Sequence, residues 1–208
     1  SANELALRID DAKPKILITA SCGIEVSRVI QYKPMIDEAI ELADYKPSKV
    51  ILLQRSQCLA PMIEGRDIDW LEAVKSASRA DCAHVKGDDP LYILYTSGTT
   101  GKPKGVVRDN GGHAVALKYS MSAVYNMQIG DVFWAASDVG WVVGHSYIVY
   151  GPLANGATTL MFEGIPTYPT VSRFWEVIAK HKVNTFYTAP TAIRALMAQG
   201  DEAVTSID

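Results

Sequence analysis

Hydrophobic positions along the chain switch repeatedly between two kinds of spacing. In some segments apolar residues recur every three to four positions, as in an amphipathic helix, and in others they form short runs, which favour buried strands. The first pattern predicts helices over residues 3–14, 35–44, 67–74, 112–127, 171–181 and 191–199. The second predicts strands over residues 15–19, 50–53, 92–95, 132–135, 158–162 and 184–187. Strands that alternate with helices indicate an α/β domain with a largely parallel sheet.

Residue types at the expected helix starts support these assignments. Asn3, Asp67 and Thr188 have side-chain oxygens that can accept hydrogen bonds from the free backbone N–H groups of a first helical turn. Pro34 and Pro190 suit that first turn, where no backbone N–H donor is needed. We therefore expect Asn3, Asp67 and Thr188 to be N-caps.

Composition narrows the class of protein. The chain has 208 residues, of which 48% are hydrophobic and 21% charged, as in an ordinary globular protein. The net charge of −3 gives no general attraction to nucleic acid or to an anionic membrane, so any anion site must be local. No apolar run approaches the roughly 20 residues of a membrane-spanning helix. Neither nucleic acid nor a membrane is an expected partner.

The cysteines and histidines lack the spacing of a metal site. Cys22, Cys58 and Cys82 form no CxxC pair, and we interpret them as buried free thiols of a reducing compartment. The histidines show neither HxxxH nor HExxH spacing. We expect no zinc site, and structural or surface roles are the default for the histidines.

The clearest chemistry lies in residues 95–106, YTSGTTGKPKGV, directly after an apolar run. Glycines allow a close approach of the backbone to a ligand, and consecutive N–H groups in such turns form a cradle for anions. Hydroxyl and lysine side chains add donors and positive charge. The segment is not a Walker A loop, because Lys102 is followed by Pro103 and the residue five before Gly101 is Thr96. The composition predicts a polyphosphate site, with ATP as the obvious ligand.

This segment resembles the phosphate-binding loop of the AMP-forming acyl-CoA synthetase and adenylation-domain superfamily. Those enzymes join a carboxylate to AMP, release pyrophosphate and pass the acyl group to a thiol. The resemblance implies that the ATP phosphates are bound by Thr96, Ser97, Gly98, Thr99, Thr100, Gly101, Lys102, Lys104 and Gly105. Lys104 and Thr96 would be the catalytic residues among them. No protein ligand of a metal is assigned, and Mg²⁺ would accompany ATP.

A second segment, residues 137–147 (SDVGWVVGHSY), places bulky apolar residues between glycines. On its own it favours the start of a core helix, with Asp138 as a turn or cap residue, over the wall of a pocket. It resembles, however, the stretch that lines the acyl pocket and thiol channel of short-chain acyl-CoA synthetases. The pocket residues would be Trp141, Val142, Val143, Gly144 and His145. Acetyl-CoA synthetases commonly carry Thr at the position of Val143, whereas propionyl-CoA-type members tend to read WVVGHSY.

Two further segments carry weaker signals. Residues 23–28 resemble the stretch that reaches the nucleotide part of coenzyme A, so the CoA site would include Glu25, Val26, Ser27 and Arg28. The guanidinium of Arg28 suits a phosphate, although a solvated surface arginine explains it equally well. Val26 and Ser27 replace the Pro-Gly common in propionyl-type members. Residues 187–194 (YTAPTAIR) resemble a superfamily segment beside the pocket and receive a supporting role.

The resemblance covers nearly the whole chain. It implies that residues 1–208 are a fragment of the large N-terminal domain of a short-chain acyl-CoA synthetase, most like the propionyl-CoA type. Its substrates would be ATP, coenzyme A and a small carboxylate (propionate favoured, acetate possible), in the cytoplasm or the mitochondrial matrix. The adenine and ribose motifs and a C-terminal domain with its lysine would belong to the missing remainder. We therefore expect residues 1–208 alone to be inactive. Separately, residues 81–90 are the most polar connection in the chain, and we interpret them as a loop inside one folding unit.

Two alternatives remain open. Another adenylate-forming enzyme, such as a peptide-synthetase adenylation domain or a luciferase-like enzyme, would keep the loop and change the acceptor. WVVGHSY and the CoA-like segment argue against it. A non-catalytic nucleotide-binding or interaction domain would keep the loop without the chemistry. The specificity of the motifs favours the synthetase.

Overall fold

The computed structural model describes residues 1–96 and 104–205, and its contacts divide the chain into two compact units. Unit 1 comprises Ser1–His84 and Tyr95–Val106, and unit 2 comprises Val85–Leu94 and Val107–Asp208. One boundary falls within residues 81–90, which we expected to be a loop inside one folding unit. Residues 77–86 are exposed coil, which is typical of a connection between units.

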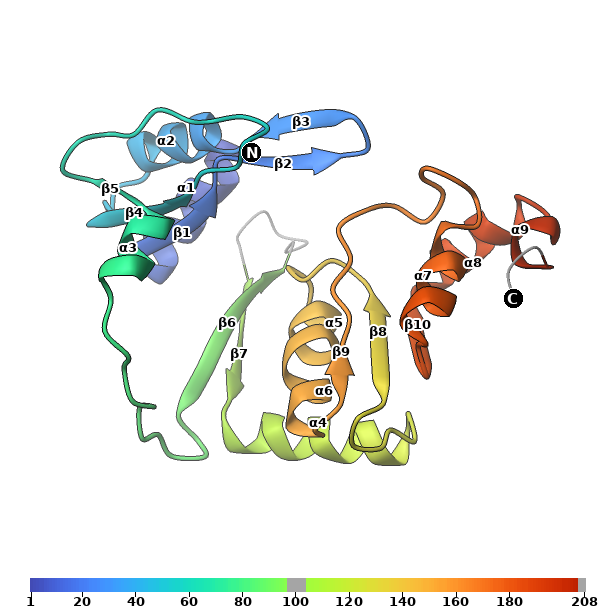
Figure 1. Ribbon diagram of the computed structural model, residues 1–208. Coiled ribbons are helices and arrows are strands. Elements are labelled where there is room, and N and C mark those ends of the chain that lie inside the picture. Colours follow the sequence, from blue (N-terminus) through green and yellow to red (C-terminus); the bar gives the residue numbers. More distant parts are fainter. Residues whose placement is uncertain (97–103, 206–208) are drawn as a thin grey trace. The chain divides into compact units, whose positions relative to one another are not determined.

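Unit 1 is built on a three-stranded parallel sheet in the order β1-β4-β5 (Figure 1). Its strands are β1 (Ile16–Ala20), β4 (Lys49–Leu53) and β5 (Asp67–Asp69). Helices α1 (Ala2–Ala12) and α2 (Lys33–Leu42) pack against each other and against one face of the sheet. Their shared core contains Ala2, Ala6, Ile9, Ile36, Ala39, Ile40, Ala43 and Val50.

Strand β1 is less buried than its apolar sequence suggests. Leu17 packs against the helical core, whereas Ile16 and Ile18 point to the other face and are 48% and 66% exposed. The predicted strand is confirmed, but the prediction that it is buried is wrong on this second face. A continuous apolar run predicts two covered faces, and here successive side chains alternate between a covered and an exposed face.

Two N-caps in unit 1 differ from the sequence prediction. Helix α1 is capped by Ser1, whose hydroxyl accepts a backbone N–H of the first turn at 3.4 Å, so Asn3 lies inside the helix. Helix α3 (Trp70–Ser76) is capped by Asp69, whose carboxylate accepts two backbone N–H groups. Asp67 is not its cap because its carboxylate bonds to Lys33 and Arg66 instead.

Asp67 belongs to a cluster of four charges, two of which are fully buried. Its side chain and that of Lys33 are fully buried, and Lys33 Nζ lies 2.8 Å from Asp67 Oδ2. Lys33 also bonds Asp37 at 2.8 Å, and Arg66 pairs with both carboxylates. Burial opposes ionisation of Asp67, but hydrogen bonds from Arg66 and Lys33 outweigh it and lower the pKa of Asp67 from 3.8 to about 2. Since the folded state has the lower pKa, this stabilisation is present above about pH 4 and is lost as the pH falls further.

Two sheets contain two strands each. In unit 1, β2 (Cys22–Glu25) and β3 (Arg28–Gln31) form an antiparallel hairpin. Strand β6 (Pro90–Thr96) pairs with β7 (Lys104–Asp109). The sequence predicts β6, but β2, β3, β5 and β7 are missed because they mix polar and apolar residues.

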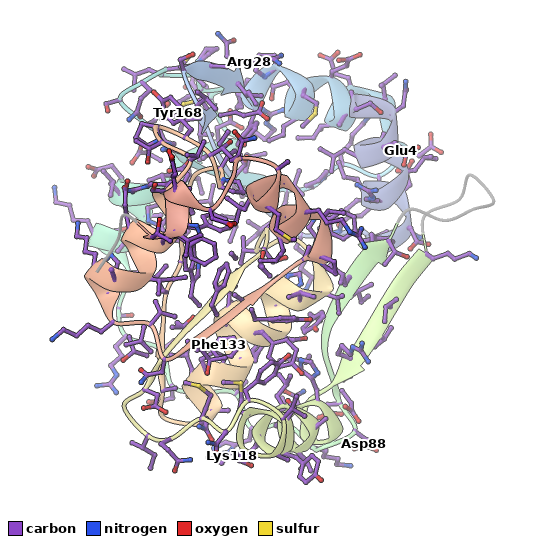
Figure 2. The ribbon with its side chains drawn as sticks, turned by 90° about the vertical axis from the view of Figure 1, so that its right-hand side faces the viewer. Glu4, Arg28, Asp88, Lys118, Phe133 and Tyr168 are labelled. Atoms are coloured by element: carbon purple, nitrogen blue, oxygen red, sulfur yellow. The ribbon has the colours of Figure 1, made fainter. Side chains whose placement is uncertain are left out.

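Unit 2 is centred on β8 (Val132–Ala136), with β10 (Thr185–Thr188) and β9 (Thr158–Thr159) parallel to it on either side. Alternate side chains of β8 enter two separate cores. Phe133, seen inside the unit in Figure 2, packs with residues of one core, and Trp134 packs with helical residues of the other. Burial on both faces is typical of a parallel sheet, and the predicted α/β fold is confirmed.

The described residues of unit 2 also form helices, several of which pack into the two cores. They are α4 (Gly111–Ala123), α5 (Val142–Gly144), the π-helical segment η1 (His145–Tyr150), α6 (Gly151–Ala154), α7 (Arg173–His181), α8 (Pro190–Met197) and α9 (Glu202–Thr205). Helix α4 ends earlier than predicted, and Asn126 beyond it has a left-handed φ of 52° that stops a helix. Strand β9 is also shorter than predicted, because Leu160 and Phe162 pack into a core without extending the strand.

The cysteines are free thiols, but only Cys22 is buried. Cys58 is half-buried and Cys82 is exposed in the coil between the units, so the expectation of three buried thiols is wrong for these two. Within residues 1–96 and 104–205 there is no group of three or more His, Cys, Asp or Glu side chains placed to hold a metal. The same residues contain no helix long and apolar enough to span a membrane.

Replacing Lys33 with Met tests the charge cluster. The change leaves the buried Asp67 carboxylate with one cation fewer, so we expect the free energy of unfolding to fall by about 3 kcal/mol. Lys15→Met removes an exposed lysine from the same unit and is expected to change it by less than about 0.5 kcal/mol. Urea denaturation measures both, and equal small effects would contradict a stabilising role of the cluster.

Candidate functional site

The predicted phosphate loop begins where β6 ends. Thr96 is the last residue of β6 and Lys104 the first of β7, and the Thr96 hydroxyl donates to the Lys104 carbonyl at 3.5 Å. Lys104 and Gly105, expected in the loop, belong to β7 and are exposed. The other predicted ligands, Ser97, Gly98, Thr99, Thr100, Gly101 and Lys102, lie outside the described residues. We call Tyr95, Thr96 and Lys104 the loop neck.

Two of the predicted motifs in unit 2 begin at the same edge of its sheet. Strands β8 and β10 are parallel and end together, with Ala136 opposite Thr188. The Thr188 hydroxyl donates to the Ala136 carbonyl at 3.4 Å, and Ala189 rather than Thr188 is the N-cap of α8, with Pro190 in its first turn. Residues 137–145 and 189–194 therefore start side by side at the carboxyl ends of parallel strands, where ligands of open α/β sheets bind.

A tight turn shapes the chain after β8. The Asp138 carboxylate accepts the Gly140 N–H at 2.6 Å, and the Asp138 carbonyl accepts the Trp141 N–H at 3.1 Å. The predicted turn role of Asp138 is confirmed. A Cβ on Gly144 would lie 2.2 Å from the Asp138 carbonyl oxygen, so only glycine fits there. This close contact fixes the backbone position of residues 141–144.

The side chains predicted to form the acyl pocket remain accessible. Trp141 is 61% exposed and Val142 37%, and Val143 is half-buried. A cavity of about 180 Å³ in unit 2 has a different lining: Leu91, Asn110, His113, Ala114, Leu117, Tyr150 and Ala154. The cavity and the predicted acyl pocket therefore do not coincide.

His145 is held by an aromatic cluster that the sequence did not indicate. Its ring stacks on Tyr92 with centroids 5.0 Å apart, and Tyr92 also stacks on Tyr150. The Tyr92 hydroxyl lies 3.4 Å from Nε2 of His113. Burial, helped by the nearby Arg108 and His145 charges, lowers the pKa of His113. Nδ1 of His145 is buried and has no hydrogen-bond partner among the described residues. No spacing in the sequence joins these residues, because they come from three separate elements.

The predicted CoA segment is the end of the β2–β3 hairpin. Glu25 and Arg28 lie opposite each other, and Val26 and Ser27 connect the strands. All four are exposed, and Figure 2 shows Arg28 at the surface of unit 1. Val26 has a φ of 58°, a region that β-branched residues rarely adopt. Positive φ at the first of two loop residues alone is typical of a type II′ turn, where glycine is preferred.

Comparison with known proteins defines the class. The sequence pattern of the AMP-binding enzyme family matches residues 1–207, and the chain belongs to this family. The predicted resemblance to short-chain acyl-CoA synthetases is confirmed by the relatives that the chain matches.

Three relatives illustrate this match. The mitochondrial acyl-CoA synthetase short-chain family member 3 of Homo sapiens is 51% identical over 201 residues, covering 96% of this chain and 29% of its own length. The acetyl-coenzyme A synthetase of Syntrophobacter fumaroxidans is 52% identical over 206 residues, covering 98% and 31%. An uncharacterised protein of Pseudomonas aeruginosa is 58% identical over 194 residues, covering 93% and 31%. The chain thus spans 29–31% of the length of these relatives.

The Val26 turn gives a direct test of backbone strain. Val26→Gly relieves the left-handed conformation, and we expect the free energy of unfolding to rise by roughly 1 kcal/mol. Val29→Gly, at an exposed strand position of the same hairpin, is expected to lower it by about 0.5–1 kcal/mol. Chemical denaturation measures both, and a loss of stability in Val26→Gly would refute the strained turn.

Proposed function

We propose that the whole protein activates a short-chain carboxylate with ATP and transfers the acyl group to coenzyme A, releasing AMP and pyrophosphate. Propionate is favoured over acetate, because the segment after β8 reads WVVGHSY. The observation that carries the proposal is the register of β8 with β10, which brings this segment beside the start of α8. The names of the relatives, a short-chain acyl-CoA synthetase and an acetyl-coenzyme A synthetase, support the same reaction class.

The reaction has two steps. A carboxylate oxygen of the acid attacks the α-phosphorus of ATP, the bond to the bridging oxygen breaks, and pyrophosphate leaves as the acyl-adenylate forms. The CoA thiolate then attacks the acyl carbonyl carbon, and AMP leaves with the electron pair. The first step requires no protein base, because a carboxylic acid is already ionised at neutral pH.

Stabilisation of charge is the main contribution of the protein to the first step. Negative charge builds on the bridging and leaving phosphate oxygens, and preorganised donors around them lower the barrier. Thr96 and Lys104, at the loop neck, supply a hydroxyl and an ammonium group. The predicted loop ligands, from Ser97 to Lys102, supply backbone N–H groups, hydroxyls and a second ammonium group.

Mg²⁺ bound together with ATP would supply neutralisation of the remaining phosphate charge. The donors fit an ion held mainly by ATP, because Mg²⁺ typically takes one or two protein oxygens together with phosphate oxygens. The loop neck would offer the Thr96 hydroxyl as a protein oxygen for such an ion.

The remaining predicted residues receive roles in acyl and thiol binding. The short acyl chain and the pantetheine end are surrounded by Trp141, Val142 and Val143. The backbone of this segment is fixed by the close contact of Gly144 with the Asp138 carbonyl. The exposed hairpin end, residues 25–28, meets the nucleotide part of coenzyme A through Arg28.

In this proposal the chain is part of a longer polypeptide. Residues 1–208 belong to the large N-terminal domain, and the rest of the polypeptide supplies the adenine and ribose contacts and a catalytic lysine. The length of the relatives supports this division, since the chain spans 29–31% of them. The proposed compartment is the cytoplasm or the mitochondrial matrix, and the human relative is named as a mitochondrial protein.

Lys104→Ala tests the phosphate site. Loss of the ammonium group removes charge stabilisation in adenylate formation, so we expect ATP–pyrophosphate exchange by the full-length enzyme to fall by about tenfold to a thousandfold. Lys180→Ala, at an exposed lysine of α7, is the control and should exchange normally. Normal exchange in the Lys104 variant would refute the assignment.

Val143→Thr tests the acyl pocket. Replacing a methyl by a hydroxyl weakens contact with the extra methylene of propionate, worth about 0.8 kcal/mol. We expect the ratio of kcat/KM for propionate to that for acetate to fall by about three- to tenfold. Val139→Thr, at an exposed position of the same segment, should leave the ratio unchanged. Steady-state kinetics with both acids measures this ratio. Equal ratios in both variants would refute the assignment of Val143 to the acyl pocket.

A further inference from the structure

The loop neck is tied to a helix far away in the sequence. The phenol O–H of Tyr95 donates a hydrogen bond to Oδ2 of Asp11, 84 positions earlier in the chain. Asp11 lies near the C-terminal end of α1, and both residues belong to unit 1. Tyr95 directly precedes Thr96, so the bond holds the backbone at the point where the neck begins.

The loop neck needs this additional hydrogen bond because strands β6 and β7 alone hold it weakly. Strands β6 and β7 form a two-stranded sheet, and an isolated pair of strands is marginally stable in water. The Thr96 hydroxyl to Lys104 carbonyl distance of 3.5 Å is at the long limit of a hydrogen bond. An O–H donor on a carboxylate belongs to the stronger class of hydrogen bonds.

The bond lies at an exposed position, and Tyr95 keeps the proton that forms it. Burial, together with the Asp11 carboxylate, raises the pKa of Tyr95 to about 12, so its hydroxyl remains a donor at neutral pH. Arg8, one turn before Asp11 on α1, lies close enough to oppose that rise. Its Nε is buried and has no hydrogen-bond partner among the described residues, and its ion pair with Glu4 is 3.9 Å long.

We propose that Asp11 is a positioning residue for ATP, which acts through Tyr95 to set the direction in which Thr96 and Lys104 enter the phosphate site. The inference rests on the proposed function. Asp11 itself does not touch substrate, and its effect reaches the reaction only through the neck. The competing interpretation is a contact that merely stabilises unit 1.

The test uses the full-length enzyme and ATP–pyrophosphate exchange with propionate at varied ATP. Tyr95→Phe and Asp11→Ala should each raise KM for ATP by about three- to tenfold and leave KM for propionate unchanged. The double variant should be no worse than the single ones, because both remove the same bond. Asp11→Asn keeps an acceptor oxygen and should recover most of the ATP affinity.

A control variant and the changes in KM and kcat distinguish a positioning role of Asp11 from a merely structural contact. Asp44→Ala, at an exposed carboxylate of unit 1, should leave both KM values unchanged. A merely structural contact would lower the active fraction, and hence kcat, without moving KM for ATP. An unchanged KM for ATP in Tyr95→Phe or Asp11→Ala, or additive effects in the double variant, would overturn the inference. Absence of exchange in the unmodified enzyme with every short carboxylate would instead overturn the proposed function, and this inference with it.

Discussion

The parallel register of β8 and β10 is the constraint on which the candidate site depends. Trp134 on β8 is fully buried against Phe162, Phe174 and Phe186, while its neighbour Phe133 enters the opposite core. A slip of one residue would exchange the two faces and break both cores, so burial fixes the register. Once it is fixed, the segments after Ala136 and after β10 must start side by side.

Unit 1 places its part of the site by polar contacts rather than by an aromatic core. The buried pair of Lys33 and Asp67 joins the start of α2 to β5, and the hydrogen bond between Tyr95 and Asp11 joins the neck to α1. Both contacts link residues far apart in the chain. The elements that present the neck and the exposed β2–β3 hairpin are therefore held by a few directed bonds, each of which a single substitution removes.

The sequence predicted the features that depend on local pattern. The main helices, the strands β6 and β8, the turn at Asp138 and the α/β class follow from periodicity and residue type. It failed where partners are distant: Asp67 resembles a helix cap, but its carboxylate bonds Lys33 across the unit. The β2–β3 hairpin was missed because Val26 carries no turn signal, and the stack of His145 on Tyr92 because no spacing links separate elements. Residues 97–103, which carry the strongest motif, lie outside the described structure.

The central claim is that the whole protein forms an acyl-adenylate from a small acid and ATP. Pyrophosphate release by the full-length protein, measured across a panel of carboxylates of increasing chain length, tests it most directly. The account predicts release that requires ATP and an acid, greatest with propionate and lower with acetate. No release above background with any short-chain acid would contradict it.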